Sequence, residues 1–182
     1  GYYNNEKHYP LRGFSCSSQQ IPGLKDKIQK YDVFASLELQ EVYGENQLKN
    51  ALHYKTDMFA SAYIENLGDG EFKVAVLPTL AQLSNINDMV VQDFNGDGFL
   101  DVLAVENLYV SEIETPRNDS GTGLLLLGNG KGRFTVKRGA DIGFYAPKDA
   151  KRMAVISIGA RKGILVGNNN DELQYFEVLD NQ

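Results

Sequence analysis

The sequence predicts a mainly β protein of antiparallel strands, preceded by a small helical segment. After residue 57 the chain consists of short apolar segments separated by turns that hold most of its 18 glycines. Glycine readily adopts the positive φ that such turns need. Before residue 58 the apolar residues instead recur three or four positions apart, which is helical spacing. We therefore expect an N-terminal helical insertion or extension over 1–57 and a β region over 58–182.

Three short helices are expected in the first region. One begins near Pro22, because proline is tolerated in the first turn of a helix. A second covers 33–43, with Asp32 as its N-cap and Gly44 as its end. A third runs over 45–52. Their apolar side chains are expected to pack on a neighbour rather than on a ligand.

The β region reads as roughly nine short strands with internal repetition. ENLGDGEFKV (65–74) resembles LGNGKGRFTV (127–136), and VVQDFNGDGFLDVLAVEN (90–107) resembles AVISIGARKGILVGNN (154–169). The offsets are about 62 and about 64 residues, which indicates repeated units separated by the insertion 108–123. Repeats of several strands joined by glycine turns are typical of β-propeller blades. We expect two to three blades in an incomplete ring, with 89–137 as the clearest.

Composition excludes several classes of protein and site. The net charge of −6 and the lack of a basic patch argue against nucleic-acid binding. No apolar run reaches the roughly 18 residues that a membrane-spanning helix needs. The single cysteine, Cys16, excludes an internal disulfide and four-ligand zinc sites that need two or more cysteines. Cys16 is expected to be a small buried hydrophobic residue.

The segment DFNGDGFLD (93–101) places oxygen-bearing side chains at every second position. Asp93, Asn95 and Asp97 fall at positions 1, 3 and 5 of a cation loop, the Phe99 carbonyl at position 7 and Asp101 at position 9. Gly98, at position 6, permits the sharp turn that such loops need. Three carboxylates and one amide favour Ca²⁺ over Mg²⁺, because calcium accepts many oxygens in loose geometry. The sequence therefore predicts a calcium site.

This loop is not an EF-hand. Position 12, where an EF-hand has a bidentate glutamate, is Ala104, and the flanking segments have strand rather than helix character. We expect the loop to join two β-strands, with Asp101 opening the second. The alternative is an Asx-rich hairpin without metal. The corresponding loop IGARKG has no carboxylate, so a metal here would tune stability rather than define the fold.

On these residues the chain resembles an FG-GAP/VCBS-type repeat. The likeness lies in VVQDFNGDGFLDVLAVEN followed by LLLLGNGKGRFTV, and it extends more weakly over 58–178. The resemblance implies a β-propeller of four-stranded blades with calcium held by Asp93, Asn95, Asp97 and Asp101 and by the Phe99 carbonyl. It also implies that the chain is a C-terminal piece of a larger secreted VCBS-repeat protein, whose signal peptide lies outside this sequence.

The functional expectation is a calcium-stabilised binding or scaffold module, secreted or on the cell surface, without catalysis of its own. Its partner is expected to be a protein or a glycan, contacted by the insertion 108–123 with Tyr109, unless that segment is an ordinary surface loop. Open blade edges would allow two copies to pair. A structural piece that only completes the ring of a larger propeller has the same sequence features.

The alternative is part of a polysaccharide-active lyase or hydrolase of the propeller type. The sequence contains none of the common hydrolase, metalloprotease or phosphate-loop motifs. GNGKG (128–132) is expected to be a hairpin turn. His8 and His53 have no carboxylate at informative spacing, and Asp69 with Asp88 would form an acid–base pair only if the fold joined them.

Overall fold

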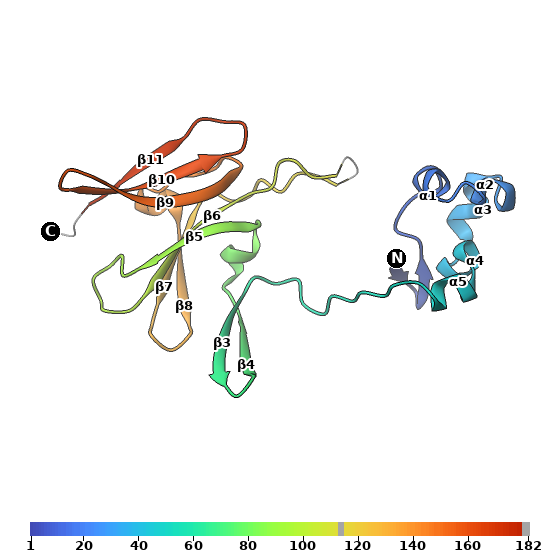
Figure 1. Ribbon diagram of the computed structural model, residues 1–182, viewed down its shortest axis with the longest axis horizontal. Coiled ribbons are helices and arrows are strands. Elements are labelled where there is room, and N and C mark those ends of the chain that lie inside the picture. The colour runs from blue at the N-terminus through green and yellow to red at the C-terminus, as the bar shows by residue number, and fades with distance from the viewer. Residues whose placement is uncertain (113–114, 180–182) are drawn as a thin grey trace. The chain divides into compact units, whose positions relative to one another are not determined.

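The computed structural model describes residues 1–112 and 115–179, and the chain divides into two compact units, Gly1–Asp57 and Met58–Gln182. Strands predominate over helices, and the described strands form antiparallel sheets, none of which closes on itself (Figure 1). The mainly β, antiparallel class predicted from the sequence is confirmed. No described helix is both long enough and apolar enough to cross a membrane.

The first unit contains a hairpin and five short helices. Phe14, Leu24, Ile28, Phe34 and Val42 form its buried core. In the hairpin, which the sequence analysis did not predict, Tyr2 stacks on Tyr9 and Tyr3 stacks on His8. The elements are β1 (Tyr2–Asn4), β2 (Lys7–Tyr9), α1 (Phe14–Gln20), α2 (Leu24–Lys27), α3 (Tyr31–Ser36), α4 (Leu39–Tyr43) and α5 (Glu45–Lys49).

The helix predicted over 33–43 is wrong as a single element. The backbone of Leu37 is extended (φ −87°, ψ 141°), and Glu38 starts a new helix as its N-cap. A capping box fixes this start, because the Glu38 backbone N–H donates to the Glu41 carboxylate at 2.7 Å. Asp32 is not an N-cap either: Lys30 holds that position and Asp32 lies in the first turn. The predicted helix end at Gly44 is confirmed, as the end of α4.

The described residues of the second unit form nine strands, one for each apolar segment that the sequence shows. They form a hairpin β3–β4, a four-stranded sheet in the order β5-β6-β7-β8 and a three-stranded sheet in the order β11-β10-β9. The strands are β3 (Ala62–Gly68), β4 (Glu71–Val76), β5 (Ile86–Gln92), β6 (Asp101–Glu106), β7 (Leu124–Gly128), β8 (Phe134–Arg138), β9 (Ala150–Ile158), β10 (Arg161–Asn168) and β11 (Gln174–Val178), with 3₁₀ turns η1 (Thr79–Gln82) and η2 (Gly139–Ile142).

Strand β6 is buried on both faces. Leu103 and Val105 pack toward Ile164 and Val166 of β10 in one cluster. Ala104, on the opposite face, packs in a second cluster with Leu124, Leu126 and Ala81. Burial on both sides explains why DVLAVE is an almost continuous apolar run rather than an alternating one.

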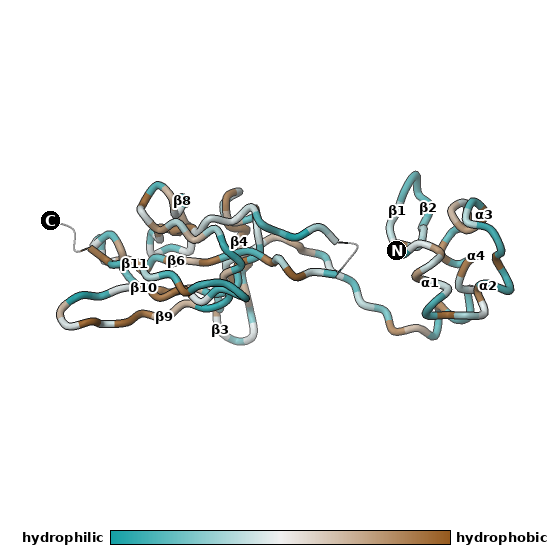
Figure 2. The backbone as a smooth tube through the Cα atoms, turned by 90° about the horizontal axis from the view of Figure 1, so that it is seen from above, coloured by the Kyte–Doolittle hydropathy of each residue, from teal (hydrophilic) through white to brown (hydrophobic). Residues whose placement is uncertain are grey.

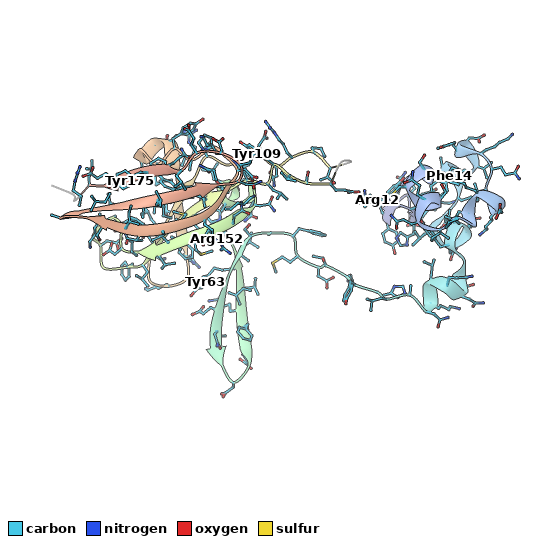
Figure 3. All side chains as sticks on the ribbon, turned by 45° about the horizontal axis from the view of Figure 1, so that its top comes forward. Arg12, Phe14, Tyr63, Tyr109, Arg152 and Tyr175 are labelled. Carbon is cyan, nitrogen blue, oxygen red and sulfur yellow. The ribbon has the colours of Figure 1, made fainter. Side chains whose placement is uncertain are left out.

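Further contacts join the sheets of this unit. Tyr63 of β3, labelled in Figure 3, meets Phe134 of β8 edge-on with ring centroids 5.6 Å apart. Strand β9 is tied to β5, because the Met153 N–H donates to the Asp88 carboxylate at 2.8 Å. Figure 2 shows hydrophobic segments along β9, where Val155 is 49% exposed. Pairing of two copies through open sheet edges stays a prediction.

Backbone pairing identifies equivalent positions in the two larger sheets. Glu106 in β6 and Asn168 in β10 each lie just after a register shift in the pairing with the preceding strand. The next residues, Asn107 and Asn169, each donate a backbone N–H to a carbonyl oxygen just before that preceding strand, at 3.1 and 2.8 Å. The ends of β6 and β10 therefore correspond residue by residue.

Candidate functional site

The 93–101 loop joins two strands, as the sequence predicted. Strand β5 ends at Gln92 and β6 begins at Asp101. Gly96 and Gly98 have φ of 76° and 86°, a conformation in which a side chain would be strained. The expected role of Gly98 in turning the chain is confirmed.

Asp93 organises the exposed part of this loop. One carboxylate oxygen accepts the Gly96 N–H at 2.7 Å and the other accepts the Gly98 N–H at 2.9 Å. These backbone hydrogen bonds, that of Gly98 first, hold the pKa of Asp93 below its ordinary value. Asp93 is therefore a carboxylate at neutral pH, the form that binds a hard cation.

Asn95 and Asp97 lie beside each other on the same exposed turn. The Asn95 amide donates to one Asp97 oxygen at 2.9 Å, and the Asn95 amide oxygen accepts the Asp97 backbone N–H at 3.0 Å. The other Asp97 oxygen accepts the Phe99 N–H at 2.8 Å. Both side chains are exposed, so turning their oxygens toward a cation would break only hydrogen bonds that water can replace.

Asp101 lies in a different environment from the other three side chains. It is completely buried, and its two carboxylate oxygens accept the N–H groups of Phe94 and Gly128 at 3.0 and 2.8 Å. Asp101 thus ties the loop to the adjacent strand β7, a role that the loop spacing did not reveal. Any bond to a cation would use the oxygen lone pairs that these two N–H groups leave free.

The residues fit a calcium loop in their chemistry. Asp93, Asn95 and Asp97 are gathered on one turn, Asp101 anchors it, and the ring of Phe99 covers Gly130. Within 1–112 and 115–179, no group of three or more His, Cys, Asp or Glu side chains has a metal-holding arrangement. The loop would complete its donor set with an amide and a backbone carbonyl, as calcium sites do.

A buried polar centre at Asn107 was not singled out by the sequence analysis. Asn107 is completely buried and has a φ of 88°. Its amide donates to the carbonyl oxygens of Gly121, Pro147 and Lys148 at 2.9 to 3.0 Å, and its amide oxygen accepts the Ser84 hydroxyl at 2.8 Å. The recurrence of asparagine at the ends of 90–107 and 154–169 was the signal, although the repeat does not show which copy is buried.

Glu106 is the second site residue that the sequence analysis missed. Its side chain is 2% exposed, and within the described chain its Oε1 atom has no hydrogen-bond partner. Burial raises the pKa of Glu106 to about 7, an effect that the backbone N–H groups of Gly123 and Thr122 partly offset. The sequence pattern does not indicate that Glu106 is buried, because a glutamate at the end of an apolar strand normally reaches solvent.

Two of the weak catalytic candidates, His53 and Asp88, make structural hydrogen bonds. The His53 ring nitrogen bonds the Leu48 carbonyl oxygen at 2.6 Å. Asp69 occupies the exposed β3–β4 turn with a φ of 50°, whereas Asp88 holds the Met153 N–H. Cys16 is half-buried rather than buried as expected.

The glycine turn GNGKG is a hairpin connection, as predicted. The Asn129 side chain accepts the N–H groups of Lys131 and Arg133 at 2.9 and 3.2 Å. This bonding closes the turn between β7 and β8 and leaves no sign of a phosphate loop.

The insertion 108–123 is anchored at its base. The Tyr109 hydroxyl donates to the Pro147 carbonyl at 2.8 Å, and the Arg117 guanidinium lies 4.7 Å from the Tyr109 ring centroid. Tyr109, labelled in Figure 3, is thus a structural anchor as well as a candidate contact residue. Residues 113 and 114 of the insertion lie outside the described part of the chain.

Comparison with known proteins gives no relative. No protein-family model, no curated protein and no solved structure matches this chain.

Proposed function

We propose that residues 58–182 form a calcium-stabilised binding or scaffold module of propeller-type blades, in a protein that works outside the cell. The observation that carries the proposal is the 93–101 loop. It gathers an ionised Asp93 with Asn95 and Asp97 on one exposed turn between two strands.

The arrangement suits a divalent cation on electrostatic grounds. Asp93 and Asp97 belong to one short turn, and two carboxylates close together repel each other unless a cation lies between them. Asp101 holds the ends of the loop together through its own buried carboxylate. The exposed side-chain oxygens of the loop take no part in these two hydrogen bonds. A loop of this kind matches sites with dissociation constants of about 10⁻⁴ to 10⁻³ M, which extracellular calcium occupies.

A thermal melt tests the calcium site. At about 10 mM calcium, such constants stabilise the folded unit by about 1.4 to 2.7 kcal/mol relative to EDTA. Asp97→Asn removes one ligand charge but keeps an acceptor for the Phe99 N–H. We expect the variant to lose most of the calcium-dependent rise in Tm.

The matched control is Asp69→Asn, which makes the same substitution in the exposed β3–β4 turn. It should keep the full calcium response. A wild-type Tm that is the same in calcium and EDTA, or an equal response in Asp97→Asn, rejects the metal site.

A further inference from the structure

A cavity of about 400 Å³ lies next to Glu106 and is separate from the calcium loop. It is formed by η1, the segment before β7, and the segment from β8 through η2. Leu80, Leu83, Leu124 and Ala140 supply apolar walls, and Ser120, Thr122 and Tyr145 supply hydroxyl groups. The charged residues that line it are Glu106, Arg138 and Asp141.

The charge balance of the cavity depends on Glu106. Arg138 is the cation of the lining, and its Nε and Nη2 atoms donate to the two Asp141 oxygens at 3.0 and 3.2 Å. The charges of Arg138 and Asp141 cancel, so an ionised Glu106 leaves the cavity with one uncompensated negative charge. A buried carboxylate oxygen without a donor is costly, and a cationic donor compensates it best.

We propose that this Glu106 cavity binds an aliphatic primary ammonium group, with the Glu106 carboxylate as acceptor and counter-ion. The leucine walls accommodate an alkyl chain, and the carboxylate receives the charged end. The same chemistry is offered by a free alkylamine and by a lysine side chain of a protein partner. The inference rests on the proposed binding role and names the group that this role recognises.

The ionisation of Glu106 gives the binding a pH dependence. The charged residues that share the cavity lining with it are Arg138 and Asp141, which pair with each other, and Tyr145 is the remaining titratable residue of the lining. Without ligand, the pKa of Glu106 is about 7. An ammonium group favours the ionised carboxylate, so binding lowers this pKa, and affinity rises as the pH increases through 7.

Nuclear magnetic resonance on the full chain with ¹³C-labelled glutamate tests the proposal. The probes are n-butylamine and n-butanol, which share a chain length but differ in charge. We expect saturable shifts of the Glu106 signal and a lowered pKa with n-butylamine, and no such change with n-butanol. Equal effects of the two probes, or no saturable effect of the amine, overturn the proposal.

Three variants locate the binding. Glu106→Gln keeps the side-chain shape and should weaken n-butylamine binding about tenfold or more, because a hydrogen bond to a charged group is lost. Leu83→Ala alters the 48% exposed wall without touching the carboxyl group and should weaken binding less. Glu71→Gln, on the exposed start of β4, should change nothing. Unchanged binding in both Glu106→Gln and Leu83→Ala contradicts the proposal. If one of these two variants is poorly folded, the other still provides the test.

Two further measurements are needed. One distinguishes a free amine from a lysine side chain as the ligand, and the other distinguishes the amine proposal from the calcium proposal. A short peptide with one lysine, compared with the same peptide carrying norleucine, binds more tightly than n-butylamine if a protein partner is the source. A lysine peptide no tighter than n-butylamine assigns the cavity to free amines. Titrations in calcium and in EDTA show whether amine binding survives when the calcium response of the 93–101 loop is absent, so either proposal can fail alone.

Discussion

The ends of strands β6 and β10 occupy equivalent positions but differ in chemistry. Strand β6 ends in Glu106 and is followed by Asn107, both buried, whereas β10 ends in Asn168, half-buried, and is followed by Asn169, exposed. Glu106 Oε1 and Asn168 Oδ1 are the buried side-chain atoms that lack a hydrogen-bond partner in residues 1–112 and 115–179. The same backbone arrangement thus carries a titratable carboxyl group beside a cavity, that of Glu106, and a neutral amide, that of Asn168.

The loops before these strands differ in the same way. Strands β5 and β6 are joined by the carboxylate-rich 93–101 loop, whereas β9 and β10 are joined by a tight turn in which Arg161 pairs with Ile158. Asp101 starts β6. Near the start of β10 lies Gly163 instead, which is buried under the ring of Tyr175. The β9–β10 pair therefore forms without an acidic loop, whereas the β5–β6 pair includes Asp101 as a buried tie to β7.

The largest effect is expected at the strand-end asparagines. Asn107→Ala removes the three donated hydrogen bonds and the two accepted ones of a fully buried side chain. It should lower the free energy of unfolding by about 4 kcal/mol, whereas Asn169→Ala at the exposed equivalent should cost less than about 1 kcal/mol. Urea denaturation of the two variants measures the difference, and equal losses would contradict the assigned roles.

A smaller effect, and one that depends on pH, is expected at Glu106. Its folded pKa of about 7 exceeds the ordinary value of 4.5, so between these values the folded state binds more protons than the unfolded state. The free energy of unfolding therefore falls as pH rises from about 4.5 to 7, by up to about 3 kcal/mol. In Glu106→Gln this fall should be absent, since glutamine does not titrate.

Denaturation of the wild type and of Glu106→Gln at pH 5 and pH 8 measures this contribution. Asn168, the equivalent in β10, is neutral and contributes no such slope. An identical pH dependence in the two proteins would show that Glu106 titrates normally.

The smallest of the three effects is expected at Asp101. Asp101→Asn leaves one acceptor for two buried N–H groups, those of Phe94 and Gly128, and should cost about 2 kcal/mol. Because this loss is structural, it should also appear in EDTA, unlike the effect of Asp97→Asn. A loss confined to calcium-containing buffer would instead make Asp101 chiefly a ligand.

The sequence predicts the strands of the second unit well because their burial has a simple pattern. Glycine turns separate the apolar segments, and DVLAVE is apolar on both faces because both faces of β6 are covered. The helices were less predictable. Apolar spacing over 33–43 suits one helix, but the Glu38–Glu41 capping box starts a new helix inside it.

The candidate sites depend on contacts between distant segments, which a sequence pattern does not contain. Asp97 and Asp101 look alike in the DFNGDGFLD pattern, yet one is exposed and the other is completely buried. The difference arises from the Gly128 N–H, which lies 27 residues away in the chain. Glu106 and Asn107 depend in the same way on distant segments, whose positions only the folded chain determines.

Gly128 gives the site a recognisable signature. A Cβ atom at this position would lie 2.1 Å from the Leu100 carbonyl oxygen, so the two backbones meet where no other residue fits. Any chain that repeats this close approach must therefore place a glycine at the end of the strand that follows. In this chain the same glycine N–H donates to the Asp101 carboxylate, so the position combines a steric requirement with a hydrogen bond.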